Sequence, residues 1–210
     1  MFSYNPSIVI TSILLSISSL CFAQDWTLER DRSGVKIYTR FVKGWDLKQF
    51  KGIVNIRTDI KTVENTLRDD EGRNKWMYNT FDSKDIKKVS ENEIYGYSRV
   101  DAPWPVSDRD NVTKYTYKKI SDKEMYVYIN NVSGITPERG GIVRIYRMDG
   151  YWHFIETSPG NTQVTQLAVA EAGGSIPAWL ANSSIIDSPY NTLLNLKNLI
   201  EGRNWYQVKN

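Results

Sequence analysis

Histidine and cysteine are almost missing from this chain of 210 residues, which has one of each, His153 and Cys21. A single histidine excludes a histidine-rich metal site, and a single cysteine excludes a disulfide within the chain. Past Cys21 there is no thiolate to act as a nucleophile. We therefore predict no metal, no cofactor and no catalytic residue.

A strong excess of one charge is also missing. The chain carries 27 basic and 24 acidic residues, for a net charge of +3. A protein that binds nucleic acid through a dense basic face needs a larger excess, so we predict no nucleic-acid partner. The balance still permits a small basic patch that touches anionic lipid headgroups.

The first 24 residues contain no charged side chain. Residues 8–20 form an apolar run interrupted by serines, and Cys21-Phe22-Ala23 is typical of a small-x-small cleavage site. The run is shorter than the roughly 20 residues of a membrane-spanning helix. We predict a secretory signal peptide at 1–23 and a secreted or periplasmic domain at 24–210. Because no Lys or Arg precedes the run, an uncleaved amino-terminal anchor is the alternative.

Most of the remaining chain alternates apolar and polar residues with a period of two, which predicts half-buried antiparallel strands. The predicted strands cover residues 35–40, 50–57, 84–89, 93–100, 110–119, 124–130, 142–148, 151–157 and 163–170. Asp59 is predicted to cap a short helix that carries Ile60, Val63 and Leu67 on one face. Asp149-Gly150, between two alternating runs, predicts a two-residue hairpin turn.

The period changes after Gly173-Gly174. Ile176-Pro177 opens a helical pattern that ends near Gly202, and Pro189 within it is expected to kink the helix or break it in two. The apolar residues that recur at helical spacing are Trp179, Ile186, Leu193, Leu196 and Ile200. The fold class is therefore α+β: a curved antiparallel sheet with a long carboxy-terminal helix across its mouth and a concavity between them.

Five segments, in this order, resemble the START family, the steroidogenic-acute-regulatory-related lipid-transfer domains. They are residues 31–40, Trp76, Pro103-Trp-Pro-Val-Ser-Asp-Arg-Asp110, Pro137-Glu-Arg-Gly-Gly-Ile-Val-Arg144 and Gly174-Ser-Ile-Pro-Ala-Trp-Leu180. The resemblance implies a helix-grip fold that encloses a hydrophobic cavity for one lipid. It also implies a gate formed by the loop at 131–141 and the carboxy-terminal helix.

Strand alternation indicates which side chains line such a cavity. Lys114 and Lys118 share a face that should be solvated, so Thr113, Tyr115 and Tyr117 are expected to point inward. On the next strand, alternation leaves open whether Met125, Val127 and Ile129 or Tyr126, Tyr128 and Asn130 face inward. The candidate cavity residues are Tyr97, Arg99, Thr113, Tyr115, Tyr117, Tyr128, Asn130, Arg144, Trp179 and Ile186.

Arg99 and Arg144 could each bind a lipid phosphate or carboxylate bidentately, although strand arginines more commonly face solvent. In the START family, sterol-binding members can carry a cavity arginine where this chain has Tyr115, so the resemblance does not extend to that sterol site. Asp108, Arg109 and Asp110 are expected to form a charge pair that closes the Pro-Trp-Pro corner and to be structural. Candidate gate residues are Val132, Ile135 and Pro137, although the same composition also makes an ordinary surface loop.

The predicted function is non-enzymatic binding and transfer of one lipid or other hydrophobic molecule, with transient contact to a membrane surface. The first alternative is an enzyme, because related helix-grip folds include cyclases and hydrolases. The second is a sensory module in which the ligand regulates binding to another protein.

Overall fold

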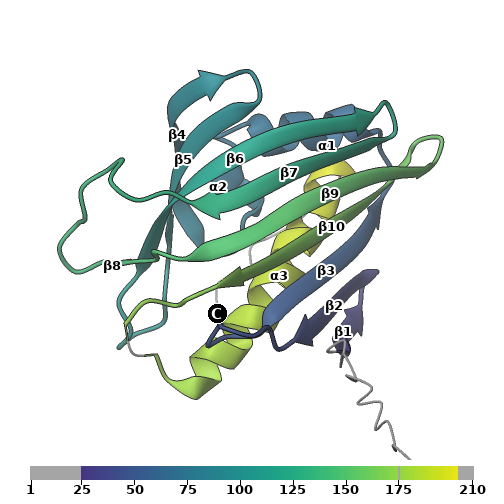
Figure 1. The fold of residues 1–210 in the computed structure, drawn as a ribbon. Coiled ribbons are helices and arrows are strands. Elements are labelled where there is room, and N and C mark those ends of the chain that lie inside the picture. Colours follow the sequence, from purple (N-terminus) through teal and green to yellow (C-terminus); the bar gives the residue numbers. More distant parts are fainter. Residues whose placement is uncertain (1–24, 175, 203–210) are drawn as a thin grey trace, which may run out of the picture.

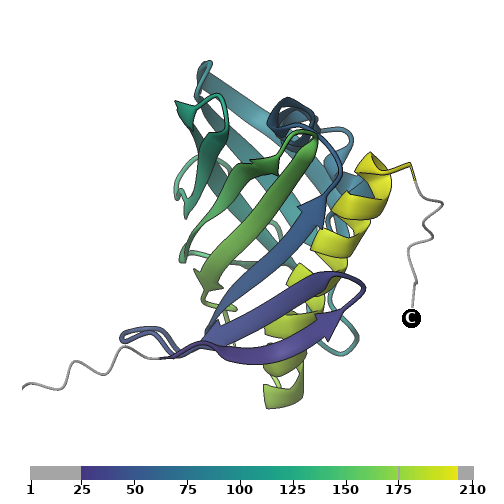
Figure 2. The same cartoon turned by 90° about the vertical axis from the view of Figure 1, so that its right-hand side faces the viewer.

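The computed structural model describes residues 25–174 and 176–202. The predicted signal peptide lies outside the described residues. One sheet of ten strands curves around the carboxy-terminal helix (Figures 1 and 2), in agreement with the predicted α+β class. The strands are β1 Thr27–Arg32, β2 Val35–Arg40, β3 Gln49–Ile56, β4 Thr80–Ser90, β5 Glu93–Val100, β6 Arg109–Ser121, β7 Glu124–Asn131, β8 Val143–Arg144, β9 Met148–Ser158 and β10 Asn161–Ala170.

The strand order is β1-β2-β3-β10-β9-β7-β6-β5-β4, and every neighbouring pair on this path is antiparallel. The short strand β8 pairs in parallel with the start of β6. β2 and β5 have the predicted bounds, whereas β1 was not predicted, and most of the predicted strand at 142–148 is a loop around β8.

Within the described residues, three helices accompany the sheet: α1 Ile60–Arg68, α2 Arg73–Trp76 and α3 Ala178–Ile200. The start of α1 confirms the predicted cap, because the Asp59 carboxylate accepts a 2.7 Å hydrogen bond from the Thr62 backbone N–H. Such a bond satisfies one of the free N–H groups of the first turn. Val63 and Leu67 are buried, as their helical spacing predicts.

Helix α3 is continuous through Pro189, so of the two expected effects of this proline, a kink or a break, the break is wrong. The helix packs against β2 and β3 on one side of the sheet, here called the inner face (Figure 2). Contact is closest at Gly52, where an added Cβ would lie 2.5 Å from Leu193 Cδ1 and 3.1 Å from Ile37 Cδ1. The missing side chain therefore lets α3 rest directly on β3.

The expected hairpin turn at Asp149-Gly150 is also wrong, because both residues lie inside the continuous strand β9. Gly150 pairs with Ile129 on one side and Ala168 on the other. A Cβ at this position would lie 2.2 Å from the Leu167 carbonyl oxygen. The glycine permits close approach of a neighbouring strand, which is the other common reason for glycine within a strand.

The antiparallel order gives the sheet two distinct ends. At the loop end lie residues 41–48, 101–108, 132–142 and 171–177, together with the start of α3. At the hairpin end lie α1, the tight turns at 91–92, 122–123 and 159–160, and the end of α3. Among the described residues, no helix has the length and apolar character required to cross a membrane.

Candidate functional site

The inner face is traced by the pairing register between strands. Tyr115 pairs with Ile94 and Ile129, and Tyr117 pairs with Val127. All these side chains are buried and belong to the hydrophobic core. Thr113, Tyr115 and Tyr117 thus occupy the inner face, as alternation predicts, while their contact with a ligand stays a prediction.

On β7 the inward set is Met125, Val127 and Ile129. The assignment of Tyr128 and Asn130 to the interior is therefore wrong, because both lie on the opposite, outer face. There Tyr128 packs with Tyr126 and Tyr151, and the Asn130 side-chain amide donates a 2.7 Å hydrogen bond to Asp149.

Tyr97 and Arg99 are also on the outer face, since Tyr97 pairs with Val112 while its neighbour Gly96 pairs with Thr113 on the inner face. The Tyr97 ring is buried beneath Arg139, whose Cζ lies 4.9 Å from the ring centroid. Arg99 bonds Asp108 through Nε at 3.0 Å and Nη2 at 2.5 Å. Neither residue reaches the interior, so both cavity assignments are wrong.

Arg144 faces a carboxylate of its own chain. Its guanidinium donates two hydrogen bonds to the buried Asp110, and it reaches the backbone oxygens of Thr136 and Pro137 at 3.3 Å each. The bond to Asp110 raises the pKa of Arg144 despite the opposing effect of burial. Arg144 therefore fastens the 132–142 loop to β6, and its predicted role as a headgroup ligand is wrong.

The Pro-Trp-Pro corner is closed by different partners from those predicted. Asp108 pairs with Arg99 and accepts a hydrogen bond from the Ala102 N–H at 3.1 Å. Arg109 donates to the backbone oxygens of Ser107 and, at 3.4 Å, Ala172. A charge pair within residues 108–110 is thus a wrong expectation, and Arg109 instead joins the corner to the segment that precedes α3.

The predicted gate residues lie on the loop between β7 and β8. Val132 is half-buried, with its N–H bonded to the Val112 carbonyl at 2.9 Å, whereas Ile135 and Pro137 are exposed. Large apolar side chains gather at this end. Those exposed there are Trp104 at 91%, Phe41 at 60%, Tyr146 at 59%, Phe81 at 47% and Ile135 at 38%.

Two members of the predicted cavity set lie on α3. Ile186 is partly buried and packs against the core. The side chain of Trp179 lies outside the described part of the structure, so its contact with a ligand stays a prediction.

Arg73, on α2, is a fully buried cation that was not predicted from the sequence. Its Nε donates to the Leu67 carbonyl at 3.1 Å, and its Nη2 lies 2.8 Å from Asp85. Burial disfavours the charge, but the neighbouring Tyr115 and Asp85 raise the pKa of Arg73 above its usual value. An inner-face glycine, Gly96, makes room, because a Cβ there would lie 2.9 Å from the Tyr115 ring and 3.4 Å from Arg73 Nη1.

In the part of the chain that the structure describes, several buried polar atoms, including one of this cation, have no hydrogen-bond partner. They include Arg73 Nη1, Tyr117 Oη, Trp76 Nε1, Asn131 Oδ1 and Gln166 Oε1. Burial raises the pKa of Tyr117 to about 12, so its phenol stays neutral and able to donate. Unpaired buried polar groups are costly, which makes this apolar interior receptive to a ligand with matching polar atoms.

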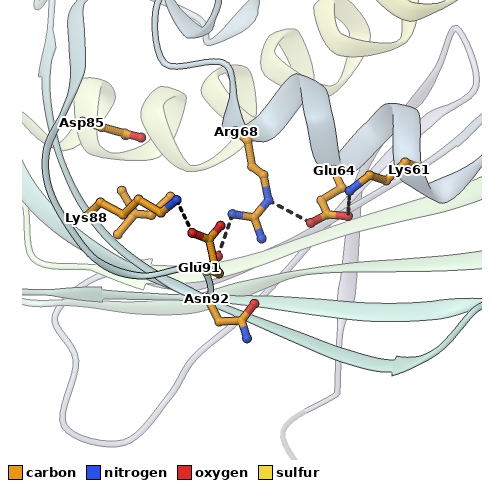
Figure 3. Close-up of a pocket in the computed structure, with 8 residues that line it drawn as sticks. Lys61, Glu64, Arg68, Asp85, Lys88, Glu91 and Asn92 are labelled. Atoms are coloured by element: carbon orange, nitrogen blue, oxygen red, sulfur yellow. Dashed lines mark hydrogen bonds and ion pairs between the residues drawn. The ribbon is translucent and has the colours of Figure 1, made fainter.

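Two pockets lie at the hairpin end, beside α1. The smaller, of about 470 Å³, is lined by Lys61, Glu64, Arg68, Asp85, Lys88, Glu91, Asn92 and Ile94 (Figure 3). Its charges pair with one another, for Arg68 bonds Glu64 at 2.8 Å and Lys88 bonds Glu91 at 2.6 Å. The larger, of about 860 Å³, extends to the inner-face side chains of Tyr117 and Met125. The mutual pairing leaves the smaller pocket without a free charge for a ligand.

His153 lies on the outer face, stacked on Tyr126 with ring centroids 4.2 Å apart and bonded to Glu124 at 3.0 Å. Across residues 25–174 and 176–202, no three His, Cys, Asp or Glu side chains gather in an arrangement that could hold a metal ion.

Comparison with known proteins gives this architecture a family. The model of the START domain matches residues 22–191. The chain belongs to the START domain family. This confirms the resemblance drawn from the five sequence segments and the helix-grip fold that it implies.

Relatives within the START family extend over most of the chain. An uncharacterized protein of Pseudomonas aeruginosa is 34% identical over 195 residues, which cover 93% of this chain and 96% of that protein. The mouse phosphatidylcholine transfer protein is 23% identical over 75% of each chain. A crystal structure of the STAR-related lipid transfer protein from Xanthomonas axonopodis is 36% identical, with a TM-score of 0.77, and covers 84% of this chain and 98% of that one.

Membership of the START family supports binding of a lipid or another hydrophobic ligand. An aromatase/cyclase from Streptomyces shares the fold at 12% identity and a TM-score of 0.53, over 73% of this chain and 91% of that one. That likeness concerns the fold alone, because one fold serves both carriers and enzymes.

Proposed function

We propose that this protein binds one lipid-like molecule between the inner face of the sheet and α3, and exchanges it with a membrane at the loop end. The observation that carries the proposal is the START match over residues 22–191, in a chain whose apolar inner face holds partnerless polar atoms. A lipid supplies both the apolar surface and the polar headgroup that such an interior can accept.

The energetics favour retention in water. Enclosing about 400 Å² of apolar ligand surface, at roughly 25 cal/mol per Å², contributes on the order of 10 kcal/mol before the costs of binding. Arg73 Nη1 and Tyr117 Oη both have free capacity to donate a hydrogen bond. A carboxylate or phosphate oxygen of the ligand would accept these two hydrogen bonds.

Exchange is assigned to the loop end. Trp104 and Ile135 lie on separate loops there and expose apolar surface that water solvates poorly. The segment that precedes α3 lies beside residues that follow both loops, because Arg109 bonds the Ala172 carbonyl and Gly173 lies beside Val143. Contact of these side chains with a bilayer would allow the 132–142 loop, with Val132, Ile135 and Pro137, to open as the gate.

The site of action in this proposal is outside the cytoplasm, in the periplasm or the exterior, because the uncharged apolar segment at the amino terminus has the pattern of a secretory signal. Lipid transfer requires no chemical step, and the proposed activity is accordingly non-enzymatic.

The test is native mass spectrometry of the purified full-length chain, followed by solvent extraction and identification of the released molecule. A stoichiometric lipid is expected, and incubation with vesicles should exchange it. A protein that is empty and takes up no lipid from vesicles would refute the proposal.

A further inference from the structure

Two cations near the loop end lie beside the same aromatic ring and form no ion pair with a carboxylate in the described part of the chain. Arg40 ends β2 and Lys51 lies near the start of β3, both on the outer face. In the described part of the chain neither forms an ion pair with Asp or Glu; the only side-chain hydrogen bond of Arg40 goes to the neutral Gln49, at 2.8 Å. By contrast, Lys36 on the outer face of β2 pairs with Asp31, and Arg147 at the loop end pairs with Glu171.

Aromatic rings lie close to both cations. Arg40 Cζ and Lys51 Nζ each lie 4.4 Å from the ring centroid of Trp26, and Lys51 Nζ lies 4.9 Å from that of Tyr38. Cation–π attraction offsets part of the cost of bringing like charges together. Partial burial, and then the charge of Arg40, lower the pKa of Lys51. The arrangement is a positive site with no counter-charge of its own.

We propose that Trp26, Arg40 and Lys51, here called the Trp26 site, bind the phosphates of an anionic bilayer surface. A bilayer matches all three side chains, because tryptophan favours the headgroup region and each basic residue near an anionic surface is attracted to it. The Trp26 site lies on the outer face beside the 41–48 loop, which carries the exposed Phe41. The Trp26 site and the 132–142 loop thus both belong to the loop end, to which the exchange with a membrane is assigned.

The Trp26 site rests on the proposed exchange at a membrane and adds a lipid preference to it. Electrostatic attraction would favour vesicles that contain anionic phospholipid over neutral ones, and it would weaken as salt screens the charges. The exposed loop-end side chains Trp104 and Ile135 are uncharged, so they would not supply this preference.

The experiment compares binding of the full-length protein to vesicles of phosphatidylcholine alone and of phosphatidylcholine mixed with phosphatidylglycerol. The variant R40Q/K51Q removes the two charges at the loop end. The control K87Q/K118Q removes two charges from the hairpin end, where Lys118 is exposed at the end of β6. We expect R40Q/K51Q to lose about tenfold in affinity for the mixed vesicles, and the control to lose much less.

Equal losses in the two variants, or no loss in R40Q/K51Q, would overturn the Trp26 site. A second measurement titrates inorganic phosphate and follows the Trp26 indole signal by NMR. Saturation by phosphate without any preference for anionic vesicles would overturn the bilayer as the source. Lipid retention, measured by mass spectrometry without vesicles, is separate: an empty protein that still prefers anionic vesicles would refute lipid carriage while the Trp26 site stands.

Discussion

Arg144 and Asp110 form a buried bidentate pair, with Nε 2.6 Å from Oδ1 and Nη2 3.0 Å from Oδ2. The pair joins β8 to β6, where only two residues of each strand are in register. Because Arg144 also bonds backbone oxygens of the 132–142 loop, one side chain holds this loop against the sheet.

Replacement of Arg144 by leucine should lower the free energy of unfolding by about 3–5 kcal/mol, because the buried Asp110 loses the cation that balances its charge. Denaturant titration measures this change. The double variant D110L/R144L should recover most of the loss, since it buries no lone charge. If R144L kept its stability but altered which lipid is retained, the headgroup role rejected above would be restored.

Gly52 is expected to tolerate no side chain beneath α3. Gly52→Ala should cost about 1–3 kcal/mol, because the new methyl group overlaps Leu193 in a packed core. The control is Gly140→Ala, where no atom lies within 4 Å of the new Cβ. The double variant G52A/L193A should lose less stability than the sum of the losses in the two single variants, because L193A removes the overlap. Additive costs would argue against direct contact.

Trp104→Ala should slow lipid exchange with vesicles about tenfold, because the variant lacks the large apolar side chain that would move from water into the membrane. The melting temperature should stay unchanged, because this side chain is 91% exposed. Ile120→Ala is the control, as Ile120 is 49% exposed but lies at the hairpin end. Equal exchange rates in the two variants would remove the loop end as the docking surface.

Tyr117 should lose its proton later than an ordinary tyrosine, because burial raises its pKa from 10.0 to about 12. The folded state thus favours the neutral phenol, and this contribution to stability is complete below pH 10 and is lost as the pH rises through 12. Ultraviolet difference titration against Y117F should show one phenolate forming near pH 12. Ionisation of that phenol near pH 10 would contradict its burial.

Local patterns predicted several elements closely, because the responsible interactions are near in sequence. Asp59 caps α1 through a residue three positions away, and the bounds of β2 and β5 follow from their alternation. The role of Gly150 could not be predicted from local sequence, because it depends on β10, which approaches from another part of the chain.

The interior was harder to predict, because alternation separates two faces of a strand without telling which is inside. Tyr97 and Tyr128 were assigned inward, and only the register with β6 and β9 places them outside. The burial of Arg73 could not be predicted from the sequence, because three acidic residues shortly before it suggest a solvated segment. Its burial becomes evident only when Asp85 and Tyr115 arrive from β4 and β6.

Gly96 sets a limit on how this protein can diversify. Glycine has the smallest side chain of any residue, so any substitution at Gly96 reduces the space beside Tyr115 and Arg73. More room at this point of the inner face can therefore come only from smaller side chains opposite the glycine. Replacement of Tyr115 by a smaller residue would free volume, and the buried guanidinium of Arg73 would keep its carboxylate partner.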